Sequence, residues 1–217
     1  MKSPKTNSIK ILIADDHEII RQGLKTIIAE TPDLCVVAEA ENGNEVLEKI
    51  TNIDVDVVVL DYDMPGKNGL DTLIDLKSIL PKIPVLILSI FPEDHYGTRF
   101  LKAGAAGYLG KASASDQLVE AVRKVSKGGK FVSPELTDKL VANLNKDSEK
   151  LPHETLTDRE FQVFCMLAAG KKLKEIAETL CLSVNTVSTY RSRILVKMDI
   201  ENNADLIHYA IKNGLVN

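Results

Sequence analysis

Residues 55–66 read Val-Asp-Val-Val-Val-Leu-Asp-Tyr-Asp-Met-Pro-Gly, and this stretch decides the fold. The side chains from Val57 to Leu60 are all apolar, which favours a strand covered on both faces, as in a parallel sheet. We place this central strand at Val55–Leu60. Patterns of the same kind predict four more strands, at Ile9–Ala14, Leu34–Ala40, Val85–Ser89 and Ala106–Leu109.

Helical patterns alternate with these strands. Apolar residues recur at helical spacing within residues 19–28, 70–76 and 118–125. Regular alternation of strand and helix predicts an α/β domain with a doubly wound, five-stranded parallel sheet of flavodoxin-like order and helices on both faces. We expect this domain to occupy residues 1–130.

The pattern changes after residue 130. Residues 131–153 are irregular and largely polar, which predicts a linker with one short helix within residues 136–144. No strand pattern remains in residues 154–217. Thr157 and Glu160 have the spacing of a capping box, which marks the start of a helix. We expect an all-α domain there, with four helices over residues 158–169, 172–180, 184–198 and 204–213.

The charge balance limits the classes of function. With 27 basic and 31 acidic residues, the net charge is −4, which argues against a protein that coats nucleic acid by bulk charge. Residues 1–130 hold 16 basic and 19 acidic residues, whereas the last 67 residues hold eight of each. The acidity therefore belongs to the first domain and the linker. The average conceals a cationic segment, Ser183–Met198, which contains no acidic residue.

Cysteine usage and hydropathy exclude other classes. Three cysteines at wide spacing form no CxxC pair, so neither a zinc site nor a disulfide framework is supported. No apolar stretch approaches the roughly 18 residues of a membrane helix. The apolar run near the N-terminus is too short for a signal peptide. These features predict a cytoplasmic protein with no membrane partner.

Chemically active residues follow the predicted strands, at the ends where ligands of parallel sheets bind. They are Asp15, Asp16, Asp61, Ser89 and Lys111. Three carboxylates at one edge would repel one another without a cation, and carboxylate oxygens favour Mg²⁺. Asp61 is then suited to act as a nucleophile that forms an aspartyl phosphate. Ser89 and Lys111 are suited to bind the phosphoryl oxygens.

Each of these residues also has a simpler interpretation. Asp16 is a common type of helix N-cap, and Asp61 precedes a turn sequence at residues 63–66. A single serine or lysine is most often a surface or capping residue. We favour the functional interpretation because all four strand ends carry the required chemistry together.

The segments ILIADDHEIIRQGL, VVVLDYDMPGKNGLDTL, LILSI and GAAGYLGKAS resemble the CheY-like receiver domain of bacterial two-component response regulators, over residues 9–128. The resemblance implies that Asp61 accepts a phosphoryl group from a sensor histidine kinase. It also implies that Asp15 and Asp16 bind Mg²⁺, together with Asp61 and the backbone carbonyl of Asp63.

The same resemblance assigns phosphoryl binding to Ser89 and Lys111. Tyr108 matches the switch aromatic that turns inward on activation, although an ordinary aromatic on a half-buried strand explains it equally well. Two features depart from the family pattern. Asp63 adds a carboxylate beside the acceptor, and Ala112 stands after Lys111 where many receivers carry a proline, which leaves the geometry of that loop open.

Residues 156–198 read LTDREFQVFCMLAAGKKLKEIAETLCLSVNTVSTYRSRILVKM and resemble the LuxR-type helix-turn-helix of NarL/FixJ-family regulators, in a likeness that continues to Val216. Ser183 is a natural N-cap for the helix that would enter the major groove. The alternative is a solvated cationic helix face. The candidate DNA-contacting residues are Lys172, Asn185, Thr186, Ser188, Thr189, Arg191, Ser192, Arg193 and Lys197.

These observations predict a two-component response regulator, in which phosphorylation of Asp61 controls dimerisation and DNA binding. The expected partners are a sensor histidine kinase, double-stranded promoter DNA and a second copy of the phosphorylated chain, with RNA polymerase as a further candidate. At most, slow self-dephosphorylation is expected in place of enzymatic turnover. Two alternatives stay open. Asp61-Tyr62-Asp63 also resembles the Asp-x-Asp motif of Mg²⁺-dependent haloacid-dehalogenase phosphatases, and the helical domain could instead contact proteins.

Overall fold

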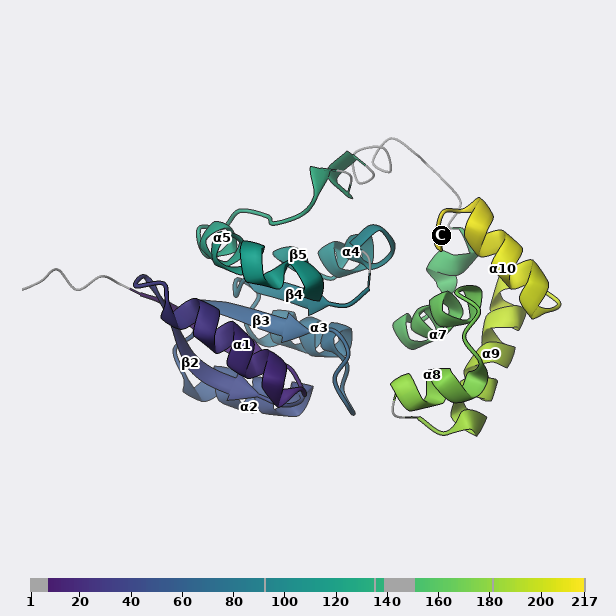
Figure 1. Ribbon diagram of the computed structural model, residues 1–217, viewed down its shortest axis with the longest axis horizontal. Helices are drawn as coiled ribbons and strands as arrows, with labels where there is room; N and C mark the ends of the chain where they lie inside the picture. The colour runs from purple at the N-terminus through teal and green to yellow at the C-terminus, as the bar shows by residue number, and fades with distance from the viewer. Residues whose placement is uncertain (1–7, 92, 135, 139–150, 181, 217) are drawn as a thin grey trace, which may run out of the picture. The chain divides into compact units, whose positions relative to one another are not determined.

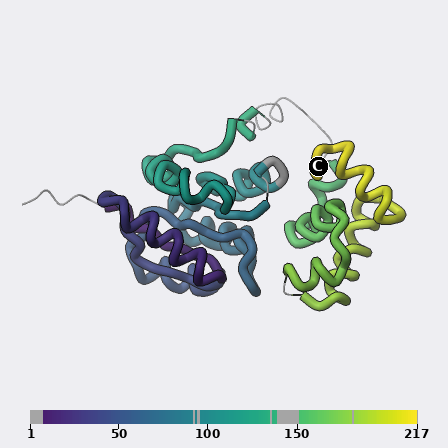
Figure 2. Tube along the Cα trace, in the orientation of Figure 1, coloured from purple at the N-terminus to yellow at the C-terminus, as the bar shows by residue number. Residues whose placement is uncertain are grey.

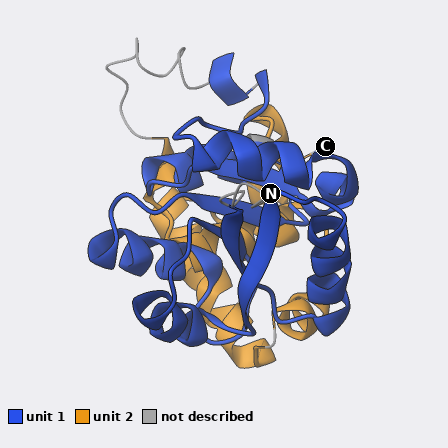
Figure 3. Ribbon diagram, turned by 90° about the vertical axis from the view of Figure 1, so that its left-hand side faces the viewer, with its two compact units in different colours: residues 1–143 blue, residues 144–217 orange. Residues whose placement is uncertain are grey.

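The computed structural model describes residues 8–91, 93–134, 136–138, 151–180 and 182–216. The chain forms two compact units, residues 1–143 and 144–217 (Figure 3). Among the described residues, no helix is long and apolar enough to cross a lipid bilayer.

The first unit is built on a five-stranded parallel sheet with the order β2-β1-β3-β4-β5 (Figure 1). This is the predicted doubly wound, flavodoxin-like arrangement. The chain alternates strand and helix throughout. The elements are β1 (Ile9–Ala14), α1 (Glu18–Ala29), β2 (Leu34–Ala40), α2 (Gly43–Asn52), β3 (Val57–Asp61), α3 (Gly69–Ile79), β4 (Val85–Ser89), α4 (Glu93–Lys102), β5 (Gly107–Gly110) and α5 (Ala114–Ser126).

Both faces of the sheet are covered. Helices α1 and α5 contact one another and pack on one face, where alternate strand residues such as Ile11, Val59 and Leu88 form the core with Leu24 and Leu118. The strand residues that alternate with these point to the other face of the sheet and are also fully buried. The helices α2 and α3 contact one another. The all-apolar central strand is therefore covered on both sides, as predicted.

Two strands differ from the prediction at both ends, and the central strand extends to Asp61, one residue past its predicted end. The central strand begins at Val57 and not at Val55. The Asp56 carboxylate accepts a hydrogen bond from the Lys10 backbone N–H at 2.8 Å, and Val55 and Asp56 lie ahead of the strand. The last strand covers Gly107–Gly110, one residue later than predicted.

Helix α3 begins directly beside the carboxyl end of β3. The Gly69 backbone N–H donates to the Tyr62 carbonyl at 2.8 Å. A Cβ atom at Gly69 would lie 2.4 Å from the main-chain oxygen of Asp61, which is far closer than a carbon atom can approach. Only glycine allows α3 to start this close to the end of β3.

Helices joined by short turns make up the second unit, and its described residues contain no strand (Figures 1 and 2). A 3₁₀ turn at Pro152–Thr155 precedes four helices, as predicted, and each boundary lies within one residue of its predicted position. The helices are α7 (Asp158–Ala168), α8 (Leu173–Thr179), α9 (Val184–Met198) and α10 (Asn203–Lys212). Their core contains Phe161, Phe164, Ile176, Val187, Ile194 and Leu206.

The predicted caps are present. The Glu160 carboxylate accepts from the Thr157 backbone N–H at 2.8 Å, while the Thr157 hydroxyl accepts from the Glu160 N–H at 3.4 Å. The Ser183 hydroxyl accepts from the Thr186 N–H at 3.0 Å and starts α9. Gly170, with a φ of +79°, directly follows the residue that caps the end of α7.

Part of the predicted linker belongs to the first unit. The Phe131 N–H donates to the Ala106 carbonyl at 3.0 Å, and the Phe131 carbonyl accepts from the Tyr108 N–H at 2.9 Å, so Phe131 pairs with β5. Residues 136–138 are helical, and the rest of the predicted helix within residues 136–144 lies outside the described residues. The boundaries at residues 130 and 153 stay predictions.

We expect Gly69→Ala to lower the free energy of unfolding of the first unit by about 1–3 kcal/mol, because the added methyl group displaces backbone at the end of β3. Urea unfolding measures this. Gly23→Ala is the matched control, since a Cβ there meets nothing within 4 Å and alanine suits a helix interior. Equal stability of the two variants would contradict the close approach of α3.

Candidate functional site

The structure brings four side chains together at the carboxyl ends of β1 and β3, which are neighbours in the sheet. Asp15, Asp16, His17 and Asp61 each offer a ligand atom, and these atoms all lie within 4.8 Å of one another. Asp15 and Asp61 are almost fully buried, at 0% and 1% exposed. His17 was not predicted. Its Nδ1 atom lies 2.8 Å from Asp16 Oδ1 and 3.3 Å from Asp15 Oδ1.

Lys111 joins this cluster from the end of β5. Its ammonium nitrogen lies 2.7 Å from Asp15 Oδ2 and 3.0 Å from Asp61 Oδ1. Burial alone would lower the pKa of Lys111, but the neighbouring charges of Asp61 and Asp15 outweigh it and raise the pKa. Lys111 is therefore a fixed positive charge between two carboxylates.

The electrostatics of Asp61 fit a cation site. Burial and the charge of Asp15 raise the pKa of Asp61 to about 6, against the opposing effect of Lys111 and a backbone hydrogen bond from Asp63. Asp61 Oδ2 is buried and has no hydrogen-bond partner among the described residues. An unpaired buried carboxylate oxygen is costly. A hard divalent cation held by Asp15, Asp16 and Asp61 would satisfy it, so the residues present fit Mg²⁺.

The simpler interpretations of the aspartates do not hold. The N-cap position of α1 is His17, and no side chain caps that helix. Asp61 is the buried last residue of β3 and does not lie in the turn that follows it. Lys111 begins a 3₁₀ turn at Lys111–Ser113, and the Lys111–Ala112 peptide bond is trans, since the described residues contain no cis bond.

Ser89 and Tyr108 are linked through Phe91. Ser89 ends β4 beside β3 and is 1% exposed, and its hydroxyl accepts from the Phe91 N–H at 3.0 Å. The Tyr108 ring is turned inward and 2% exposed, and its hydroxyl donates to the Phe91 carbonyl at 2.9 Å. An open cavity of about 720 Å³ is lined in part by Ser89, Tyr108 and Lys111. Ser89 and Tyr108, which lie on different strands, therefore both bond to the main chain of Phe91.

The predicted DNA-contacting residues of α9 divide into two groups. Val187, Ile194 and Met198 face the core, which leaves the other sides of the helix accessible. The predicted residues that are exposed are Asn185, Thr189, Ser192, Arg193 and Lys197, and those that are half-buried are Thr186, Ser188 and Arg191. Lys172 is exposed at the N-cap position of α8.

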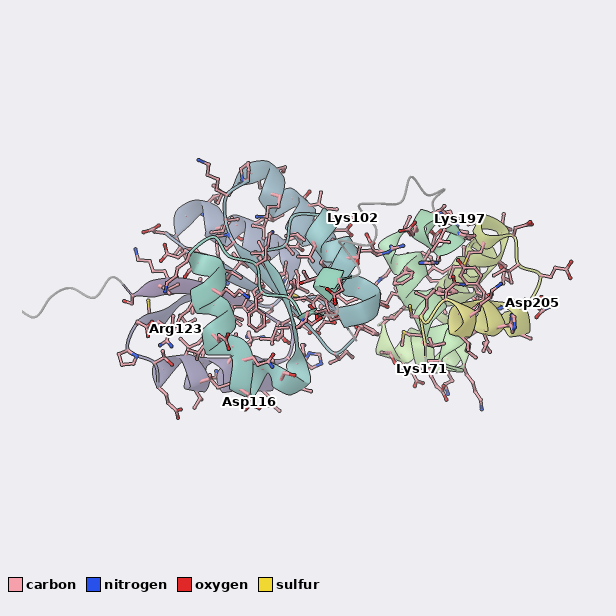
Figure 4. The ribbon with its side chains drawn as sticks, turned by 90° about the horizontal axis from the view of Figure 1, so that it is seen from above. Lys102, Asp116, Arg123, Lys171, Lys197 and Asp205 are labelled. Carbon is pink, nitrogen blue, oxygen red and sulfur yellow. The ribbon has the colours of Figure 1, made fainter. Side chains whose placement is uncertain are left out.

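Two of the predicted cations also have partners within the helical unit. Lys197 Nζ lies 2.6 Å from the Glu160 carboxylate on α7, and Figure 4 labels this lysine on the second unit. Burial would raise the pKa of Glu160, but Lys197 and Thr157 outweigh it and lower the pKa. The Arg191 guanidinium donates to the Asn203 side chain on α10 at 2.7 Å. Arg193 is exposed, so its side chain is accessible to a ligand.

The raised pKa of Asp61 predicts a pH dependence of stability. A carboxyl group whose pKa is raised on folding destabilises the native state above that pKa, here about 6, and costs nothing below the unfolded value near 3.8. In the absence of divalent cations, we therefore expect Asp61→Asn to be more stable than the natural chain at pH 8, by about 3 kcal/mol.

Thermal unfolding in EDTA at pH 8 and pH 5 measures this effect. The advantage of Asp61→Asn should shrink at pH 5, and saturating Mg²⁺ should reduce it at pH 8 by stabilising the natural chain. An advantage that grows as the pH falls would contradict the burial of an ionised Asp61.

Comparisons with known proteins give a family match for each of the two domains. The family model for the response regulator receiver domain matches residues 11–123, and the model for bacterial regulatory proteins of the luxR family matches residues 154–210. The response regulator GacA of Pseudomonas protegens is 37% identical over 208 residues, which cover 96% of this chain and 98% of GacA. The response regulator UvrY of Escherichia coli is 32% identical, with 96% of each chain covered.

A solved complex of the two-component response regulator RcsB with DNA is similar in structure, with a TM-score of 0.58 and 25% sequence identity over 94% of this chain and 98% of RcsB. GacA, UvrY and RcsB are all response regulators, so the Asp-x-Asp phosphatase alternative is set aside. A receiver fold with an acidic strand-end cluster, followed by a LuxR-type helix-turn-helix, places this chain in the NarL/FixJ family of two-component response regulators.

Proposed function

We propose that Asp61 is the phosphoacceptor of this response regulator and that its phosphorylation controls DNA binding by α9. The observation that carries this proposal is the position of Lys111, whose ammonium group lies within 3.0 Å of Asp61 and 2.7 Å of Asp15 in a buried acidic cluster. A cation facing a nucleophilic carboxylate can bind the phosphoryl oxygens as they approach.

The reaction is a transfer between two side chains. An Asp61 carboxylate oxygen attacks phosphorus, the new O–P bond forms, and the P–N bond to the histidine of the sensor kinase breaks, so that the electron pair returns to the imidazole. Asp15, Asp16, Asp61 and the backbone carbonyl of Asp63 are the proposed Mg²⁺ ligands. Mg²⁺ would neutralise charge on the phosphoryl oxygens.

Lys111 and Ser89 would hold the transferred group. Lys111 already pairs with Asp61, so it needs only to shift its hydrogen bonds from carboxylate to phosphoryl oxygens. The Ser89 hydroxyl would donate to a phosphoryl oxygen. Because that hydroxyl accepts from the Phe91 N–H and Tyr108 donates to the Phe91 carbonyl, a movement of Ser89 would reach Tyr108 through Phe91. This supports Tyr108 as the switch residue.

The proposed DNA contacts are carried by α9 and by Lys172. The exposed side chains would face base edges and phosphates, while Lys197 and Arg191 would contribute only if they leave their partners Glu160 and Asn203. RcsB, which resembles this chain in structure, has been solved in complex with DNA, and this supports the same role here. RcsB dimers on DNA support a homodimer that binds paired half-sites, and we propose that phosphorylation favours its formation.

The remaining partners follow from this function. A sensor histidine kinase would supply the phosphoryl group, promoter DNA would be the target, and RNA polymerase would respond to bound dimers. Promoter DNA would be met in the cytoplasm, so we propose that this is where the chain works. The alternative, a helical domain that binds proteins instead of DNA, predicts no duplex affinity that depends on the cations of α9.

Acetyl phosphate labelling tests the acceptor. We expect the natural chain to take up one phosphoryl group in the presence of Mg²⁺ and to take up none when EDTA is present from the start. Asp61→Asn should take up none, since an amide lacks the nucleophilic oxygen. Asp63→Asn is the matched control and should still be labelled. Full labelling of Asp61→Asn would disprove the assignment.

Duplex binding tests the helical face. We expect Arg193→Ala to weaken binding about tenfold or more, in line with the roughly 1–3 kcal/mol of a specific arginine contact, or to reduce the salt dependence if the contact is to phosphate. Lys212→Ala on α10 is the control, because it removes an exposed cation outside α9. Unchanged binding by Arg193→Ala, measured by fluorescence anisotropy at several salt concentrations, would rule out this face.

A further inference from the structure

Arg21 is a buried arginine whose side chain contacts the main chain of Asp15, a member of the acidic cluster. The residue lies on α1 and is only 6% exposed. Its Nη1 atom donates to the main-chain carbonyl of Asp15 at 2.7 Å. Asp15 is the residue with which the chain leaves β1 and enters the cluster. Nothing in the sequence pattern predicts this contact.

Acidic residues at the carboxyl end of β2 hold the other side of the guanidinium group. Arg21 Nη2 donates to the Glu41 carboxylate at 2.7 Å, and Arg21 Nε lies 3.6 Å from Glu39 Oε2. Glu39 is part of β2 and Glu41 follows it, and β2 is the neighbour of β1. The planar guanidinium group therefore has a fixed orientation, set by two carboxylates on one side and a carbonyl on the other.

These contacts determine the direction of the Asp15 side chain. Arg21 holds the Asp15 carbonyl, and the Asp15 N–H donates to the Ala40 carbonyl at 3.1 Å, so the main chain is held on both sides. The carboxylate is then directed into the site, where Oδ1 accepts from the His17 N–H at 2.9 Å and Oδ2 lies 2.7 Å from Lys111. Such support from outside the ligand set commonly tunes metal affinity.

We propose that Arg21 is a positioning residue for the phosphoacceptor site, because it fixes the main chain of Asp15 and thereby directs the Asp15 and Asp16 carboxylates toward the cation. This inference rests on the proposed function of Asp61. Without Arg21, the buried Asp15 carbonyl loses its donor, and the turn between β1 and α1 is free to change the direction of both carboxylates.

A purely structural role, in which Arg21 only attaches α1 to β2, predicts a different result. Lys25 offers the matched control, since it also lies on α1 and its ammonium nitrogen lies 2.6 Å from Glu39 Oε1. In the described part of the chain, Lys25 pairs with Glu39 and not with Asp15. Removing Lys25 therefore weakens the attachment of α1 to β2 and leaves the Asp15 carbonyl in place.

The experiment compares Arg21→Met, Arg21→Lys and Lys25→Met in the full-length chain. Isothermal titration calorimetry with MgCl₂ gives the Kd for Mg²⁺, acetyl phosphate labelling gives the Mg²⁺ concentration for half-maximal uptake, and circular dichroism verifies the fold. We expect Arg21→Met to raise both quantities at least tenfold and Lys25→Met to change them less than twofold. Arg21→Lys, which keeps the charge but not the fork of donors, should lie between them.

Values for Arg21→Met within twofold of those for Lys25→Met would overturn the inference, even if Arg21→Met unfolds at a lower temperature. If Arg21→Met does not fold, Arg21→Lys decides: a Kd for Mg²⁺ equal to that of the natural chain overturns the positioning role, and a raised Kd supports it. A natural chain that takes no label would overturn the proposed function, and this inference with it.

Discussion

Repulsion between carboxylates at the carboxyl ends of two adjacent parallel strands is the constraint on which the rest of the first unit depends. The order β2-β1-β3 places Asp15 and Asp61 beside one another, both buried. A core of this kind would be more stable with apolar residues at these positions. The chain instead retains the charges, balances them in part with Lys111, and leaves one oxygen of Asp61 for a ligand. The buried carboxylates therefore lower the stability of the fold at the site that binds the cation and the phosphoryl group.

The second unit places its charge differently. Its net charge is zero, and part of its cationic charge is used internally, since Lys197 pairs with Glu160 at the start of α7. Arg191 likewise bonds to α10. These contacts fix α9 against its neighbours and leave a small exposed set of side chains around Arg193 for a ligand. Local arrangement, and not bulk charge, therefore determines how this unit can meet DNA.

Much of the fold could be predicted from sequence because its patterns are strong. The strands β1, β2 and β4 and the helix α9 lie where periodicity and capping residues place them. The meeting of Asp15, Asp61 and Lys111 followed from the rule that ligands bind where parallel strands end. By contrast, α2 and α4 were not among the predicted helical segments, although α2 buries Val46 and Ile50 one turn apart and begins at the Asn42 cap.

The contacts that could not be predicted are those made to the main chain. The bond from Arg21 to the Asp15 carbonyl and the pairing of Phe131 with β5 leave no periodic trace in the sequence, since any acceptor carbonyl looks alike. His17 was missed for a related reason: a histidine after two aspartates is as consistent with a helix start as with a ligand. Only the three-dimensional arrangement distinguishes these cases.

The most direct test is the DNA affinity of the natural chain and of Asp61→Asn, each measured with Mg²⁺ in the presence and absence of the phosphoryl mimic beryllofluoride. We predict that the mimic raises the affinity of the natural chain and leaves that of Asp61→Asn unchanged. An equal response of the two proteins, or no response of the natural chain, would contradict the control of DNA binding by Asp61.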